Sequence, residues 1–109
     1  MVMTDVESVA ANTTTANILA GKAMEFVPEP SVVSIGICAS AVGLKATVVI
    51  GSEVVVDDQE VSAANHMPLF PDDVLAEGGA FAGDRITVRL HNTTAGAITG
   101  FTKINVSPA

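Results

Sequence analysis

The sequence predicts an all-β fold, a single antiparallel β-sandwich or jelly roll of about seven or eight short strands. Apolar and polar residues alternate with a period of two in several stretches, most clearly in Ser31–Ser40 and Arg85–His91, as expected of strands with one buried face. Turn-forming residues recur about every ten residues, which is typical of a sandwich, jelly roll or small barrel. No segment suits a long crossover helix, so a parallel α/β fold is excluded.

The first twelve residues are expected to form a loosely held N-terminal arm. Residues 1–12 have no clear hydrophobic period, and Thr13-Thr14-Thr15 opposes a helix. An arm that docks on a neighbouring subunit is the sharper alternative. The β domain is then expected to span residues 13–109, because the length of the chain suits one domain and not two.

The first two strands are expected before Pro28. Thr13–Leu19 and Ala23–Val27 flank Gly21-Lys22, which suits a tight turn. Pro28 and Pro30 end the pairing because proline has no N–H to donate to a ladder.

Ser31–Ser40 is expected to be a strand with one apolar face. Gly36 lies in its middle on the opposite parity, which predicts a bulge or the close approach of another backbone. The inward residues are expected to be Val33, Ile35, Ile37 and Ala39.

A hairpin is expected next, in which Leu44–Ile50 is followed by a returning strand that contains Val54 and Val56 and ends at Asp57-Asp58. Gly51-Ser52 fits its two-residue loop, because glycine adopts the positive φ that a type II′ turn needs first. The inward residues of the first strand are Leu44, Ala46, Val48 and Ile50.

Residues 59–83 are expected to form the longest and least regular connection. Pro71-Asp72-Asp73 has the composition of a helix start, since proline suits the first turn and acids suit the positive end of the helix dipole. Gly78-Gly79 would end this one short helix.

The last predicted element is a hairpin of Arg85–His91 and Ala97–Val106 around the turn-rich Asn92–Gly96. Phe101 has the outward parity, so Gly100 is expected to mark a bulge that re-aims it. The inward residues are Ile86, Val88, Leu90, Ile98, Ile104 and Val106.

Composition limits the partners of the chain. The net charge is −7 and no basic run is present, which argues against direct nucleic-acid binding and, with no apolar stretch of about 20 residues, against membrane insertion. Only 16% of the residues are charged, against about 25% in an average domain. A surface so poor in charge predicts that part of it is covered by a partner or by copies of the chain, although alanines and valines scattered singly would explain it too.

No catalytic, cofactor-binding or metal-binding residues are predicted, and an enzyme is not expected. The two histidines have no paired spacing, so the metal site of cupin enzymes cannot be built. Cys38 is expected to be a structural thiol in a chain made in a reducing cytoplasm. The loop acids lack the spacing of a calcium loop, and calcium binding by them is left open: Asp57, Asp58, Asp72, Asp73 and Glu77.

The segment Gly83–Thr94, followed by Ala95–Gly100, resembles the closing hairpin of small jelly-roll virion proteins of the phage capsid or capsid-decoration type. The resemblance implies a single jelly roll that is made in the host cytoplasm and located in the virion. Its expected partners are itself and other capsid proteins. Genome-packaging shell proteins usually carry a basic arm, whereas this N-terminus is acidic, which favours a role on the outer surface or at a distance from the genome.

Two functions are therefore considered. The first is a structural virion protein that assembles into symmetric capsomers, as a trimer or pentamer. The second is a lectin-like or adhesin-like sandwich that holds a ligand in the loop of residues 65–83. Subunit contacts in the first case are expected at Val49, Val55, Leu69, Phe70, Arg89, His91 and Phe101.

Overall fold

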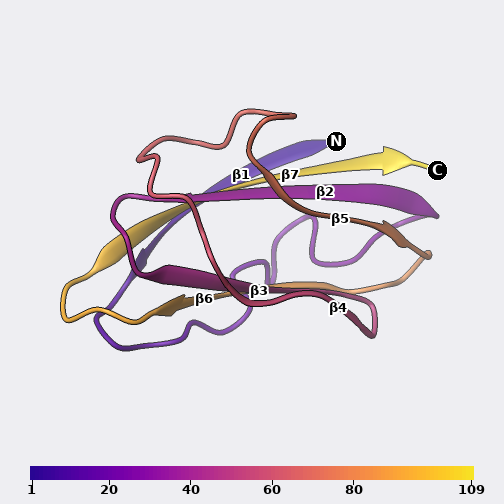
Figure 1. The fold of residues 1–109 in the computed structure, drawn as a ribbon. Helices are drawn as coiled ribbons and strands as arrows, with labels where there is room; N and C mark the ends of the chain where they lie inside the picture. Colours follow the sequence, from indigo (N-terminus) through magenta and orange to yellow (C-terminus); the bar gives the residue numbers. More distant parts are fainter.

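The computed structural model describes residues 1–109 and is an all-β sandwich without helices (Figure 1). One sheet has four strands in the order β1-β7-β2-β5, and the other has three in the order β4-β3-β6; all pairs are antiparallel. The predicted all-β class is thus confirmed. No helix is present that could span a membrane. The strands are β1 Val2–Val9, β2 Ser31–Ala39, β3 Leu44–Ile50, β4 Glu53–Glu60, β5 Val74–Ala80, β6 Ile86–Asn92 and β7 Ile98–Pro108.

The core between the sheets is entirely aliphatic. It consists of 22 buried valine, isoleucine, leucine, alanine and methionine residues. The alternation predicted for β2, β3 and β6 is confirmed, because their expected inward residues are all buried. The two-residue hairpin loop between β3 and β4 is also confirmed, with Gly51 at a φ of 61°.

Residues 13–27 lie along the free edge of β6 and stand in for an eighth strand. The backbone N–H groups of Thr15 and Ile18 donate to Leu90 and Val88 at 2.8 and 2.9 Å. Asn17 continues this pairing with its side chain: its Oδ1 accepts the N–H of Val88 at 3.0 Å. The hairpin expected around Gly21-Lys22 is therefore wrong, since Thr13–Leu19 and Ala23–Val27 form no ladder with each other and only isolated bridges to the β6 side.

With this segment counted, the strand order is consistent with a jelly roll, in which eight strands form two sheets. The irregular backbone of residues 13–27 has a physical cause. Asparagine and threonine side chains compete with the ladder by bonding to backbone groups themselves, and the Thr15 hydroxyl likewise accepts the N–H of Leu90 at 3.0 Å.

The N-terminus is strand β1 and not the expected arm. It pairs with β7 from Val2↔Asn105 to Val9↔Ile98. The sequence shows no apolar alternation in this strand, because the positions that face inward carry acidic residues as well as Met3 and Val9. Asp5 is neutralised there by an ion pair with Lys22.

The connection predicted for residues 59–83 is shorter than expected, and the short helix is wrong. Val74–Ala80 is β5, which pairs with β2. Gly78 does not end a helix; it lies in the strand, where an added Cβ would be 3.3 Å from Ile50 Cδ1 on the other sheet. Pairing with β2 and close packing of the sheets outweigh the local helix signal.

The expected closing hairpin is also wrong in its pairing. β6 pairs with β3, whereas β7 pairs with β1 and β2, so residues 92–97 cross from one sheet to the other. The pairing of β7 continues through Gly100 without a bulge, and Phe101 faces outward by simple alternation. Gly100 instead makes room for the opposite sheet, because an added Cβ would be 2.8 Å from Leu90 Cδ1.

The side chain of Asn92 holds this crossing in place. It is fully buried. Its Nδ2 donates to the carbonyls of Val9 and Gly96 at 3.0 and 2.7 Å. Its Oδ1 accepts the N–H and hydroxyl of Thr94 at 2.9 and 2.7 Å. One amide therefore ties β1, β6 and the crossing together.

We predict that Asn92→Ala lowers the free energy of unfolding by about 2–4 kcal/mol, because it leaves buried carbonyl and N–H groups without partners. Urea denaturation followed by circular dichroism measures the change. Asn105→Ala is the matched control, because Asn105 is only partly buried and its side chain makes no hydrogen bond. An equal loss of stability in both variants would contradict the role given to Asn92.

Candidate functional site

The residues predicted for subunit contacts lie on two opposite faces of the sandwich. Val49, Arg89 and His91 share the outer face of the β4-β3-β6 sheet. Phe101 is on the outer face of the four-stranded sheet, and Leu69 and Phe70 belong to the segment that lies over that sheet. The structure therefore does not bring them together in one patch.

Val55 does not face outward as expected. It packs against the core. The register between β3 and β4 shifts around Val48 and Val49, so that Val54 lies opposite Val49. Val54 is 56% exposed and holds the outward position predicted for Val55.

All four phenylalanines lie outside the aliphatic core. Two of them are the most exposed aromatic side chains, Phe81 at 78% and Phe26 at 56%. They lie at the same end of the sandwich, because the segment next to Phe26 is hydrogen-bonded to the segment next to Phe81. The Val27 N–H donates to the Asp84 carbonyl at 2.9 Å, and the Gly83 N–H donates to the Val27 carbonyl at 2.7 Å. Phenylalanine at the surface of a small domain is a sign of an interaction surface.

Both chain termini are at this end as well (Figure 1). Ser31 of β2 lies opposite Ala80 of β5 and Pro108 of β7. The Met1 amino group donates to the Val106 carbonyl at 2.8 Å. Five exposed apolar residues lie on the segments that meet at this end of the sandwich, which we call the apolar end: Met1, Val2, Phe26, Val32 and Phe81.

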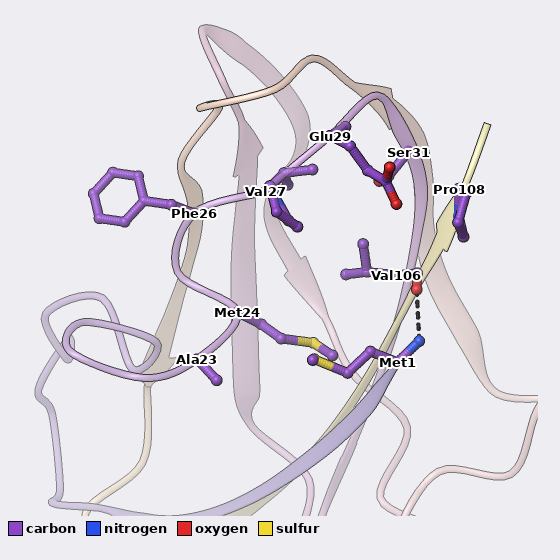
Figure 2. A pocket seen from close by; sticks show the side chains of 10 residues that line it. Met1, Ala23, Met24, Phe26, Val27, Glu29, Ser31, Val106 and Pro108 are labelled. Carbon is purple, nitrogen blue, oxygen red and sulfur yellow. Dashed lines mark hydrogen bonds between the residues drawn. The ribbon is translucent and has the colours of Figure 1, made fainter.

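A cleft of about 290 Å³ opens beside the apolar end. Figure 2 shows the side chains of Met1, Met24, Val27 and Val106 around it, with the ring of Phe26 pointing away. Its lining is mostly apolar, and Glu29 and Ser31 are at one margin. Such a recess fits an apolar side chain of another molecule.

The apolar end was missed by the sequence analysis. Phe26 and Phe81 fall in turn-rich segments, where no alternation assigns a side chain to a face. The available signal was compositional: the chain has four phenylalanines, no Trp and no Tyr, and Phe101 already has outward parity.

One exposed strand edge is acidic. β4 forms one edge of the three-stranded sheet, and Glu53, Asp57, Asp58 and Glu60 on it are exposed. Asp58 is paired with His91, whose Nδ1 is 3.1 Å from its Oδ1. Charged residues on an edge strand prevent pairing with a strand of another chain. Association through this edge is therefore disfavoured.

A second feature is the segment of residues 61–73, which pairs with the side of β2 at Ser62 and then crosses over the outer face of this strand at Gly36. An added Cβ at Gly36 would lie 2.8 Å from the Asp73 carbonyl, the Phe70 ring and Pro68 Cβ. Both alternatives predicted for Gly36 are confirmed, because the β2–β5 register also shifts between Ile35 and Gly36. The glycine lets the segment lie directly on the strand.

Cys38 lies beneath the same segment. Its side chain is fully buried, and the neighbouring Ala39 N–H donates to Ser62 at 2.8 Å. Burial raises the pKa of the Cys38 thiol, and the negative charge of Asp73 raises this pKa further. The thiol is therefore protonated at neutral pH in the folded chain.

Comparisons with known proteins give no relative: no protein-family model, no curated protein and no solved structure matches this chain.

We predict that Gly36→Ala lowers the free energy of unfolding by about 1–3 kcal/mol, because the methyl group meets backbone and ring atoms that have no room to move. Gly79→Ala is the matched control in the paired strand, since an added Cβ there meets nothing within 4 Å. That control should leave stability unchanged or raise it by about 0.5–1 kcal/mol. Equal denaturant midpoints for the two variants would show that the segment does not rest on Gly36.

The raised pKa of Cys38 predicts a pH dependence of stability. The folded chain holds the thiol proton more tightly than the unfolded chain, whose thiol pKa is about 8.5. The stabilisation is complete below that value and is lost as the pH rises through the raised pKa of the folded state. Urea denaturation between about pH 7 and about pH 10, with reductant and chelator present, should show a steeper fall for the wild type than for Cys38→Ala. Parallel curves would contradict the prediction.

Proposed function

We propose that this chain is a structural virion protein, a capsid or capsid-decorating subunit that self-assembles into a symmetric oligomer. The observation that carries the proposal is the placement of the phenylalanines: all four lie outside the aliphatic core, and two of them, Phe26 and Phe81, are exposed at one end of the sandwich. The resemblance of residues 83–100 to the closing hairpin of jelly-roll virion proteins supports the virion assignment at the level of sequence only, because β6 and β7 do not pair with each other. The strand order of the whole chain is consistent with a jelly roll.

The distribution of charge supports a closed oligomer. The acids of β4 oppose the addition of a strand at that edge, so copies are not expected to extend the three-stranded sheet there. Side-chain contacts between identical copies lead to rings such as trimers or pentamers when the rotation closes. The apolar end and its cleft supply a protruding ring and a recess on one subunit, which suits a contact of this kind.

The loop that would hold the ligand of a lectin-like or adhesin-like module does not exist as one loop in the structure. Residues 65–83 do not form one loop: residues 65–73 lie over β2, residues 74–80 are β5, and only residues 81–83 belong to a turn. The single loop on which this second function rests is absent, so it is not proposed.

We predict that native mass spectrometry and light scattering at tens of micromolar show a homo-oligomer, and that the double variant Phe26→Ser/Phe81→Ser shifts it to monomer with at least a tenfold weaker association. The stability of the isolated subunit should change by no more than about 0.5 kcal/mol per site, because both rings are exposed in it.

The matched control is Val42→Ser/Val54→Ser, which removes two side chains that are 69% and 56% exposed elsewhere. It should leave the oligomer intact. A wild-type chain that is strictly monomeric at these concentrations and does not co-sediment with larger particles would overturn the proposed function. If the oligomer persists in Phe26→Ser/Phe81→Ser, the subunits do not meet through the apolar end.

A further inference from the structure

The segment of residues 61–73 brings three side chains with metal-ligand chemistry together above β2. The Cys38 sulfur, a His66 ring nitrogen and an Asp73 carboxylate oxygen all lie within 4.8 Å of one another. They come from positions far apart in the sequence, and the segment that carries two of them is held on the strand at Gly36. We propose that Cys38, His66 and Asp73 bind one Zn²⁺ ion per chain.

The ligand types fit zinc. Thiolate sulfur, imidazole nitrogen and carboxylate oxygen are the three donors that Zn²⁺ takes from proteins. A tetrahedron with bonds of about 2.0–2.3 Å separates its ligands by about 3.3–3.8 Å, so the side chains need to close by about 1 Å. His66 is exposed, so its ring has room to make this adjustment.

A water molecule would complete the tetrahedron. A cavity of about 310 Å³ is lined by Cys38 and Asp73, together with Ser62 and Asp72. It opens beside the three side chains and leaves space for the fourth ligand.

The hydrogen bond of His66 prepares the ring for a metal. Nδ1 lies 2.8 Å from the carbonyl of Met67. A carbonyl only accepts, so Nδ1 carries the proton and the neutral ring keeps its lone pair on Nε2. Metal-binding histidines commonly have this arrangement, in which one ring nitrogen donates to a carbonyl and the other binds the ion.

Asp73 is oriented in a similar way. Its Oδ2 accepts the N–H of Leu69 at 2.8 Å, and its Oδ1 makes no hydrogen bond within the chain. One oxygen therefore fixes the carboxylate, and the other remains for the ion. Carboxylate ligands at metal sites are typically held by such outer hydrogen bonds.

Charge balance favours the complex. Zinc binding replaces the thiol proton of Cys38 with a sulfur–zinc bond and releases that proton to the solvent. The thiolate and the carboxylate then carry two negative charges against the two positive charges of the ion. The carboxylate of Asp73 also attracts the cation by its own negative charge.

A bound ion would fasten residues 61–73 to β2 and add to the stability of the sandwich. This inference is independent of the proposed virion function, because the three ligands lie away from the apolar end and belong to one chain.

Cobalt titration of the reduced, chelator-treated chain tests the site. Co²⁺ alone should produce a thiolate-to-cobalt charge-transfer band that saturates at one ion per chain, and Zn²⁺ should abolish it. Competition with a chromophoric chelator then gives the zinc affinity. His66→Gln should weaken Zn²⁺ binding at least tenfold, and Cys38→Ser should remove the band.

His91→Gln is the matched control, because His91 also lies beside an aspartate, Asp58, but has no cysteine near it. It should bind Zn²⁺ as the wild type does. If Cys38→Ser fails to fold, His66→Gln still decides, since His66 is exposed. Absence of the thiolate band, or equal zinc affinity in wild type and His66→Gln, would overturn the proposal and leave an adventitious ion only.

Discussion

The rest of the structure depends on the close packing of two sheets through aliphatic side chains alone. Small core residues set a thin sandwich, and glycines are needed where the sheets come nearest: added Cβ atoms at Gly100 and Gly78 would lie 2.8 and 3.3 Å from Leu90 and Ile50. An interior packed to crystal density has no space for larger groups. The four phenylalanines are consequently outside the core, which leaves aromatic side chains on the outer side of the molecule.

Two irregular segments complete what seven strands leave open. Residues 13–27 satisfy the backbone of β6 with both main-chain and side-chain groups, and residues 61–73 cover the outer face of β2. Unpaired edges and bare apolar faces both cost free energy or invite association. Side chains replace a ladder at these places: Asn17 accepts from Val88, and Asn92 fixes the crossing between the sheets. Removal of one such amide would therefore break hydrogen bonds to several elements at once.

The sequence predicted strands well where alternation is continuous and buried, as in β2, β3 and β6, because period two reports directly which side chains face the core. It failed for β1, where Asp5 takes an inward position that only Lys22 makes tolerable, and for β5, where Gly78-Gly79 resembles a helix stop. Strand pairing could not be predicted, because alternation shows which side chains face the core but not which strands lie side by side. The sequence therefore predicted β6 and β7 as a hairpin. The apolar end and the Cys38 cluster were missed for the same reason, since tertiary structure alone brings their residues together.

Association of identical subunits with a net charge of −7 has to overcome their mutual repulsion. That repulsion is strongest where acids are concentrated, as along β4, and is screened beyond about 8 Å at physiological ionic strength. The apolar end combines exposed rings with few charges: Glu25 there is paired with Arg85 at 2.8 Å, and Glu29 is at the margin of the cleft. Burial of Phe26 and Phe81 against a copy would gain about 25 cal/mol for each Å² of apolar surface removed from water. The acidic edge of β4 and the apolar end thus act together, since the first disfavours the addition of a strand at that edge and the second favours contact at one end of the sandwich.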